Sequence, residues 1–277
     1  MKEKDGDSIA ASRALEAAWS LGRPTGARGF LIDRLTSIGI EKLQAGVLRK
    51  MREPSLAWMG RLSEPSWTAI LDALERETGP KSGMEANDFT KAVRRVYRAT
   101  ADHYRKLSAC DASRQTDDEA WRAVSSEVAT DPNPGIRGSA ESPPRPEGSA
   151  ETEESSEEKR IYFKDDILSM VTPMVRRAAR VAVDRELTLR ILELRLDRSA
   201  SRDGRWPERL VNAASGVCPE VSYAYSADGD AMEIRFDGKL ADPENQLTLP
   251  LSFRAGKTST KTATSVPTPT PEPAKEP

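Results

Sequence analysis

The residues of this chain that could carry out acid–base or nucleophilic chemistry are few and scattered. His103 is the only histidine, and it lies between Asp102 and Tyr104 in the middle of a predicted helix. No Gly-x-Ser-x-Gly elbow is present to position a serine nucleophile. The Gly-x-x-x-x-Gly-Lys-[Ser/Thr] phosphate loop and a Gly-x-Gly-x-x-Gly motif opening a helix are also missing from the sequence. We therefore predict no catalytic residue, no cofactor-binding residue and no cofactor, and we interpret the chain as not being an enzyme.

The two cysteines, Cys110 and Cys218, lie far apart, and neither belongs to a Cys-x-x-Cys pair. This spacing excludes zinc-finger and thioredoxin-like motifs. One histidine and two isolated cysteines do not supply the converging ligands of a metal centre, so we predict no metal site. The cysteines are either two buried thiols or the two halves of a long-range disulfide. We favour the buried thiols, because free cysteine is usually buried.

Neighbouring carboxylates occur where predicted helices begin, at Asp117-Asp118 and Asp165-Asp166. At a helix N-terminus they complement the positive end of the helix dipole, which explains them without catalysis. A hydrolase would instead need two carboxyl groups facing one cleft. The sequence does not place any two of them together, and a carboxylate-dependent hydrolase is our third functional hypothesis.

A series of arginines follows the longest predicted helix, and it suggests a phosphate or membrane surface as a ligand. The series comprises Arg176, Arg177, Arg180, Arg185, Arg190, Arg195, Arg198 and Arg202. However, Asp184, Glu186, Glu193 and Asp197 are interleaved with the arginines. Helical spacing also distributes the arginines around the helix axis. We therefore interpret them as a solvated, salt-bridged face.

Composition limits the classes of partner. The length of 277 residues is enough for one large domain or two small ones. The chain is 31% charged and has a net charge of −2. Residues 131–158 hold eight acidic residues and two arginines, a charge of −6, so the rest of the chain carries about +4. That mild excess is not the clustered basic face of a nucleic-acid-binding protein. The chain also lacks the apolar run of about 20 residues that a membrane span needs.

Residues 1–130 are predicted to form a helical region. We expect helices at residues 8–21, 29–51, 55–62, 63–79, 84–109 and 117–128. The first should close at Gly22, with Pro24 beyond it. The last begins with Thr116-x-x-Glu119, the pattern of a capping box. The second helix has an apolar stripe that should form the centre of the N-terminal core. Its residues are Leu31, Leu35, Ile38, Leu43, Val47 and Met51, and Ile32 and Ile40 widen it.

Two segments are expected to be disordered. Residues 131–159 form an acidic linker rich in proline, glycine and serine, which cannot bury enough apolar surface to fold. Residues 254–277 form a tail rich in proline and threonine. Between them, residues 160–253 are predicted to form a long helix and a small sheet. The resulting fold class is α+β.

The long helix is expected at residues 165–198, with a bend at Pro173. Strands at residues 221–226 and 231–236 should form a hairpin around Asp228-Gly229. A third strand at residues 246–253 would lie at a sheet edge, because Pro250 cannot donate to a ladder. The apolar surface of the long helix exceeds what three strands can cover, so we predict that both regions share one core.

The helix and the sheet are joined by Gly204-Arg205-Trp206-Pro207, followed by Glu208-Arg209-Leu210. A long helix followed by Gly-Arg-aromatic-Pro-x-x-Leu resembles the C-terminal module of a group of uncharacterised bacterial envelope proteins. That module is itself similar to the helix-plus-sheet body of type II secretion pseudopilins. Residues 22–48 also resemble the helical region of those proteins. The resemblance implies a non-catalytic, envelope-associated role, but no filament assembly, because pseudopilins carry their helix at the very N-terminus.

The segment Gly204, Arg205, Trp206 and Pro207 is the candidate site. We expect Trp206 to pack beneath the helix end while Pro207 starts a turn; the alternative is a recognition loop whose Trp206 stacks on a ligand. The leading function is a structural or protein-interaction module associated with the bacterial envelope, with an unknown protein partner, and the second is a cytoplasmic adaptor or regulator. The acidic N-terminus is unlike a signal peptide, so we expect the cytoplasm, or the envelope if an anchor precedes Met1.

Overall fold

The structure is a computed structural model, which describes residues 5–28, 31–51, 57–63, 67–77, 88–129, 168–240 and 249–256. The predicted linker and residues 257–277 of the predicted tail lie outside the described residues. The helices are α1 (Asp5–Arg28), α2 (Leu31–Lys50), α3 (Ala57–Ser63), α4 (Ala69–Glu77), α5 (Asp88–Arg105), α6 (Ala109–Arg114), α7 (Asp117–Ala129) and α9 (Ser169–Ala200). The strands are β1 (Tyr223–Asp228), β2 (Ala231–Phe236) and β3 (Ser252–Ala255).

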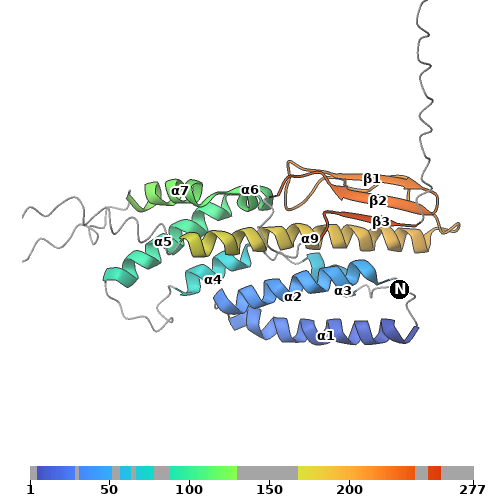
Figure 1. The fold of residues 1–277 in the computed structure, drawn as a ribbon, viewed down its shortest axis with the longest axis horizontal. Coiled ribbons are helices and arrows are strands. Elements are labelled where there is room, and N and C mark those ends of the chain that lie inside the picture. Colours follow the sequence, from blue (N-terminus) through green and yellow to red (C-terminus); the bar gives the residue numbers. More distant parts are fainter. Residues whose placement is uncertain are drawn as a thin grey trace, which may run out of the picture.

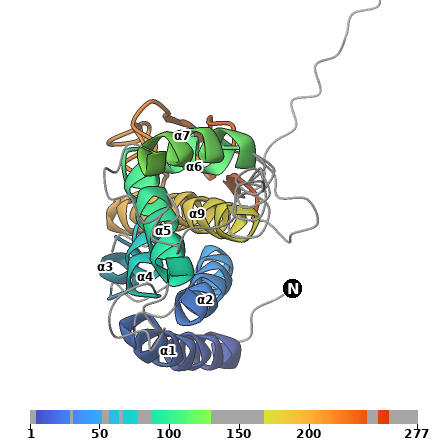
Figure 2. The same ribbon diagram turned by 90° about the vertical axis from the view of Figure 1, so that its left-hand side faces the viewer.

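The long helix α9 runs through the middle of the molecule (Figure 1). The sheet and helices α6 and α7 lie along one side of it, and α2, α3 and α4 lie along the other. Helix α1 packs outside α2, so that α2 separates it from α9, as the end-on view shows (Figure 2). The predicted α+β class, a mostly helical region with a long helix on a small antiparallel sheet, is confirmed.

The sheet is antiparallel in the order β1-β2-β3. Asp228 pairs with Ala231, so the hairpin turn has two central residues, Gly229 and Asp230. Gly229 has φ +56°, a value that glycine adopts readily and that suits the first central position of a type II′ turn. The hairpin was predicted, but β1 begins two residues later than expected. The third strand is also displaced: β3 begins at Ser252, after Pro250, and it extends into the predicted tail.

One apolar core joins the two predicted regions. It contains residues of α2, α4, α5, α6 and α7 together with residues of α9 and the sheet. Its fully buried members include Leu71, Leu74, Tyr104, Leu187 and Ile234. A smaller cluster packs α1, α2 and α3 on α9, through Leu15, Leu48, Met51, Trp58, Leu62 and Leu192. The prediction of a shared core is confirmed.

Helix α9 is buried on nearly every side between Val171 and Leu194. Alanines at 178, 179 and 182 are buried with the larger apolar residues, which lets neighbouring elements approach its backbone closely. The predicted start of this helix lies outside the described residues, and its end is Ala200 rather than residue 198. Pro173 lies in the second turn of α9. Because proline has no backbone N–H, one helical hydrogen bond is missing near the start of the helix.

Two helix ends differ from the predictions. Helix α1 does not close at Gly22 but continues through Pro24 to Arg28. Glycine and proline weaken a helix interior without forbidding helical dihedrals, so they did not end it. The helix expected at residues 84–109 is divided, because Ser108 caps a new helix, α6, by accepting a hydrogen bond from the Asp111 amide at 3.1 Å.

The capping box at the start of α7 is present as predicted. The Thr116 amide donates to Glu119 Oε2 at 2.8 Å, and the Glu119 amide donates to Thr116 Oγ1 at 3.2 Å. The first of these bonds holds the pKa of the Glu119 carboxyl below its ordinary value. This local signal could be predicted because all its atoms lie within four residues.

The prediction of one core-facing stripe on α2 is wrong for part of that stripe. Leu31, Ile38 and Met51 are buried as expected. Leu43 is 71% exposed, Val47 is 38% exposed, and Ile32, which was expected to widen the stripe, is 69% exposed. A wide apolar stripe covers more of the helix surface than its neighbours do: α9, α4 and α1 pack on the side of α2 that includes Ile38, Ala45 and Leu48.

The favoured interpretation of the cysteines as two thiols is also wrong. Cys110 and Cys218 are fully buried and form a disulfide, with Cα atoms 5.5 Å apart. The Ala109 amide donates to the Val217 carbonyl at 2.9 Å, so the start of α6 lies beside the segment before β1. This bond places the two cysteines, which directly follow these residues, close enough to join. The disulfide therefore covalently links the helical region to the sheet region.

A fragment of residues 160–253 tests the shared core. We expect it not to melt cooperatively as a monomer, because the α9 surface that packs on α2, α3 and α4 would be exposed to water. The measurement is a thermal melt followed by circular dichroism, with the full chain as the control. A monomeric fragment with a sharp transition would contradict the shared core.

Candidate functional site

The predicted site, Gly204 to Pro207, forms the corner between α9 and the sheet. Gly204 has φ +65°, a left-handed conformation that glycine adopts at little cost just beyond a helix end. Its carbonyl accepts a hydrogen bond from Arg198 Nε at 2.7 Å. The Pro207 carbonyl accepts a bond from the Tyr225 hydroxyl at 2.8 Å. The last turn of α9 and strand β1 therefore both fix the corner.

Trp206 is the centre of this corner. Its side chain is 6% exposed, and its indole Nε1 donates to the Asp230 carbonyl at 3.1 Å. The guanidinium carbon of Arg198 lies 4.6 Å from the centre of the indole ring, a cation–π contact. The indole is thus enclosed between the last turns of α9 and the β1–β2 turn. This position agrees with the expectation that Trp206 packs beneath the helix end.

Arg205 is oriented differently from Trp206. Its side chain is exposed, and its Nε lies 3.5 Å from the Asp203 carboxylate, which is also exposed. The Ser201 hydroxyl and the Arg205 amide both donate to Asp203 Oδ1, and these bonds lower the pKa of that carboxyl. The structure therefore places one half of the predicted site in the core and leaves Arg205 at the surface.

The arginines of α9 form the most extensive polar arrangement in the described part of the chain. They were predicted to lie on a solvated face, and this prediction is wrong for Arg180 and Arg185, which are buried. Four others, Arg176, Arg190, Arg195 and Arg198, are partly buried. Arg177 and Arg202 are exposed, as predicted. The error arose because arginine carries a long apolar stem, so the residue can be buried where its head finds acceptors.

Arg185 joins α9 to both α2 and α3. Its Nη1 donates to Glu41 Oε2 at 2.8 Å, and both side chains are less than a tenth exposed. Its Nη2 donates to the Arg61 carbonyl at 2.6 Å and to the Leu62 carbonyl at 3.2 Å, at the C-terminal end of α3. Carbonyls at a helix end have no partner within the helix. Arg185 supplies partners to two of them and a countercharge to Glu41.

A second buried arginine comes from α2 and points toward α9. Arg49 Nη2 donates to the Asp184 carbonyl at 2.7 Å and to its carboxylate at 3.3 Å, and Arg49 Nε donates to the Thr188 hydroxyl at 2.9 Å. Its Nη1 donates to the Pro250 carbonyl at 2.7 Å, just before β3. Arg180 Nη2 donates to the neighbouring Leu249 carbonyl at 2.7 Å. These bonds hold the start of β3 between α2 and α9.

Asp184 is fully buried beside these two arginines. Burial raises the pKa of its carboxyl, although the charges of Arg49 and Arg180 oppose the shift. A buried ion pair of this kind contributes little net stability, because removing the charges from water offsets their attraction. Its effect is to fix position, since removing one partner would leave the other buried and unpaired.

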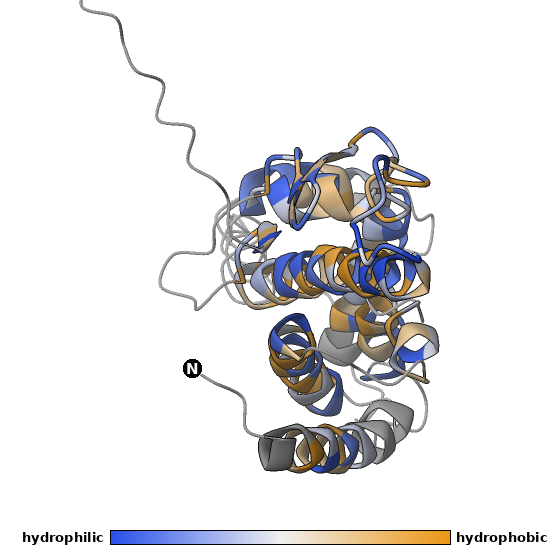
Figure 3. Cartoon of the chain, turned by 90° about the vertical axis from the view of Figure 1, so that its right-hand side faces the viewer, coloured by the Kyte–Doolittle hydropathy of each residue, from blue (hydrophilic) through white to orange (hydrophobic). Residues whose placement is uncertain are grey.

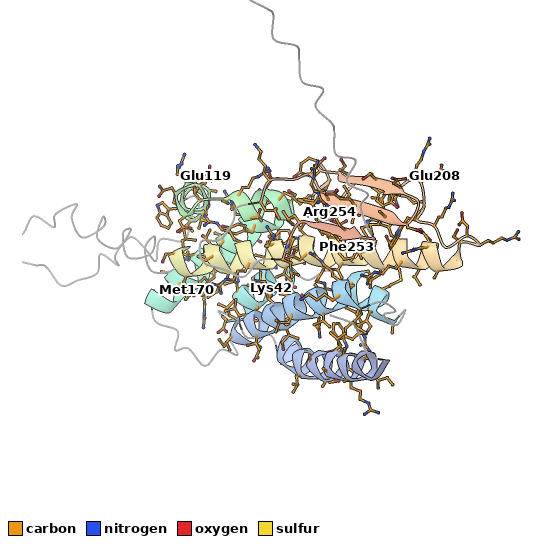
Figure 4. The ribbon with its side chains drawn as sticks, turned by 45° about the vertical axis from the view of Figure 1, so that its right-hand side comes forward. Lys42, Glu119, Met170, Glu208, Phe253 and Arg254 are labelled. Carbon is orange, nitrogen blue, oxygen red and sulfur yellow. A yellow bond between two sulfur atoms is a disulfide. The ribbon has the colours of Figure 1, made fainter. Side chains whose placement is uncertain are left out.

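Arg195 and Arg176 complete the arrangement at two more helix ends. Arg195 donates to the carbonyls of Leu48, Arg49 and Met51 at the C-terminal end of α2, with the Arg49 bond at 2.6 Å. Its guanidinium also lies 5.2 Å from the Phe253 ring centre, on the strand above α9 (Figure 4). Arg176 Nε donates to the Gln115 carbonyl at 2.6 Å, between α6 and α7.

Glu186 on α9 acts as the acceptor counterpart for the segment before β1. Its carboxylate accepts bonds from the Ser215 hydroxyl at 2.5 Å, the Gly216 amide at 2.6 Å and the Tyr223 hydroxyl at 3.0 Å. Burial, reinforced by the Glu186 charge, raises the pKa of the Tyr223 hydroxyl far above its ordinary value. A carboxylate with three donors is held in place rather than available to a substrate.

The remaining chemistry-bearing residues also have structural partners. His103 Nε2 lies 3.0 Å from Gln115 Oε1. Cys110, Cys218 and Glu220 have ligand atoms within 4.8 Å of one another, but the two sulfurs are bonded to each other. Asp117 of the first predicted carboxylate pair lies 3.5 Å from Arg176, and the second pair lies outside the described residues. The buried carboxylates Glu41 and Asp184 both face arginines.

No family model matches the chain, and neither a curated protein nor a solved structure proved significantly similar to it. In the described part of the chain, no helix combines the length and the apolar character that crossing a membrane requires.

Replacing Arg185 by methionine tests the buried arginines. We expect Arg185→Met to lower the free energy of unfolding by about 3–5 kcal/mol, because Glu41 loses its main countercharge and two carbonyls lose their donors. The matched control is Arg177→Met on the same helix, where an exposed side chain should change stability by less than about 0.5 kcal/mol. Urea denaturation measures both. Equal effects would contradict the structural role.

Two substitutions at the corner distinguish a structural element from a recognition loop. We expect Trp206→Ala to lower the free energy of unfolding by about 3–5 kcal/mol, because it removes a buried aromatic ring. Arg205→Ala should cost at most about 1 kcal/mol, because its ion pair is exposed. Thermal melts compare the two. If Trp206→Ala left the melting temperature unchanged, Trp206 would be a ligand-facing residue.

The pKa of Tyr223 gives a prediction at alkaline pH. An unfolded tyrosine ionises near pH 10, whereas folding holds Tyr223 neutral, so its contribution to stability is complete below that pH and is lost as the pH rises above it. Tyr223→Phe removes one donor to Glu186 and should cost about 1–3 kcal/mol at pH 7. The difference in the free energy of unfolding between the wild-type protein and Tyr223→Phe should narrow above about pH 10. Urea denaturation at pH 7–11 measures it, and parallel stability curves would contradict the assignment.

Proposed function

We propose that this protein is a non-catalytic structural or protein-interaction module that works in an oxidising compartment of the bacterial envelope. The observation that carries the proposal is the fully buried disulfide between Cys110 and Cys218. Disulfides form and persist in oxidising compartments outside the cytoplasm. Inside the cytoplasm, thiols are kept reduced. The likeness of residues 204–210 to envelope proteins supports the same compartment.

The use of the charged side chains supports a structural role. The buried or nearly buried carboxylates Glu41, Asp184 and Glu186 accept bonds from arginines, hydroxyls and backbone amides of neighbouring elements. Arg185 and Arg195 donate to carbonyls at the ends of α3 and α2 that have no partner within their helix. Groups used in this way hold the body rigid, and a rigid body presents a fixed surface to a protein partner.

The alternative is a cytoplasmic adaptor or regulator. In the reducing cytoplasm the same two cysteines would be thiols, and the link between α6 and the β1 side would rest on hydrogen bonds such as that from Ala109 to Val217. The two hypotheses therefore predict different redox states for the sulfur atoms of Cys110 and Cys218. They place the protein in different compartments, and this is the property that distinguishes them.

Thiol trapping in the cells that produce the protein tests this proposal. Cells are quenched in acid, free thiols are blocked with a maleimide, and the protein is examined by mass spectrometry before and after reduction. We expect both cysteines to be protected until a reductant is added. A Cys110→Ser variant, treated identically, calibrates the mass of one labelled thiol. Two labelled thiols in the wild-type protein would overturn the proposal and favour the cytoplasmic adaptor.

A further inference from the structure

The outer face of α2 is apolar and exposed to solvent. Ile32 is 69% exposed and Leu43 is 71% exposed, and Thr36, Gly39 and Val47 lie on the same helical face. The face has no charged residue between Ile32 and Val47. Figures 2 and 3 show α9 on one side of α2 and α1 on another, and no described helix or strand on the remaining flank. In a chain that is 31% charged, this is an unusual surface.

Gly39 lies at the middle of this face, in the interior of the helix. A mid-helix glycine costs about 1 kcal/mol relative to alanine. Gly46 on the same helix has a visible cause, because a Cβ there would lie 3.2 Å from the Leu249 side chain. A Cβ at Gly39 would meet nothing within 4 Å. The gap at Gly39 therefore admits an atom from outside the molecule.

We propose that this face binds the same face of a second copy of the chain, with the two α2 helices antiparallel. A twofold axis between positions 39 and 40 sets Ile32 opposite Val47 of the second copy and Thr36 opposite its Leu43. Ile40, beside the axis, then enters the gap at Gly39. The face is thus self-complementary in shape, as an isologous interface requires.

Charge selects the antiparallel direction. Asp33 lies in the first turn of α2 and Lys50 in its last turn, and neither has an ion-pair partner among the described residues. Antiparallel pairing brings Lys50 of one copy past the start of α2 in the other, about one helical turn from Asp33, and it also opposes the helix dipoles. Parallel pairing would set lysine against lysine. One helix face is smaller than the ~800 Å² per partner of a stable interface, so the association is weak and depends on concentration.

Single cysteines test both the contact and its direction. Gly39→Cys places a thiol next to the axis, and Lys50→Cys places one about 30 Å from its copy in the antiparallel pair, at 1.5 Å per residue. The native cysteines are bonded to each other, so each variant of the full chain has one reactive thiol. Under mild oxidation we expect Gly39→Cys to form covalent dimers at least tenfold faster than Lys50→Cys. Equal rates, or faster linkage through Lys50→Cys, would overturn the proposal.

Sedimentation of the unmodified chain supplies a second measurement that needs no cysteine variant. We expect its mass to rise with concentration toward that of a dimer, and Leu43→Glu to abolish the rise. The matched control is Val211→Glu, because Val211 is 78% exposed in the segment between α9 and β1. A wild-type chain that stays monomeric at millimolar concentration would overturn the pairing, even if another protein were captured through Leu43. So would a dimer that tolerates Leu43→Glu.

Discussion

The structure depends on the hydrogen bonding of one central helix that is covered on almost all sides. Helices α2 and α3 end beside α9, and carbonyls at these ends are wholly or partly buried there. Arg185 donates to carbonyls at the end of α3, and Arg195 donates to those at the end of α2. A buried carbonyl without a donor costs about 1–3 kcal/mol. Arginine suits this task because its five donors extend from an apolar stem that packs in the core.

The same constraint explains how the corner and the disulfide contribute. Arg198 fixes the Gly204 carbonyl and covers the Trp206 ring, so the chain leaves α9 in one direction. Glu186 then accepts bonds from the segment that precedes β1, and Cys218 in that segment is joined to Cys110. Sheet, corner and helical region are in this way attached to α9 at successive points along its length. A body built like this suits a protein whose role is to present a surface.

Local signals in the sequence predicted the elements well, and long-range contacts decided where the predictions failed. Two features depend only on residues that are close together in the sequence, so both could be predicted. They are the capping box of Thr116 and Glu119 and the Asp-Gly turn at 228–229. The burial of Arg185 could not be, because its acceptors lie 123 or more positions away in the chain. The outward position of Leu43 has the same cause: periodicity shows that a face is apolar, but not which neighbours will cover it. The corner could be located from Gly204 and Trp206, whereas its contact with Arg198 required the fold.

Native-state hydrogen exchange, read by mass spectrometry at increasing urea concentrations, tests the central role of the buried arginines most directly. If the buried arginines tie the surrounding elements to α9, the amides of α2, α3, β2 and α9 should share one cooperative opening, with the same dependence on urea. In the Arg185→Met variant, α3 should exchange earlier than the rest while α9 stays protected. Separate openings of α2 and the sheet in the unmodified protein, with α9 still protected, would contradict the central role of these contacts.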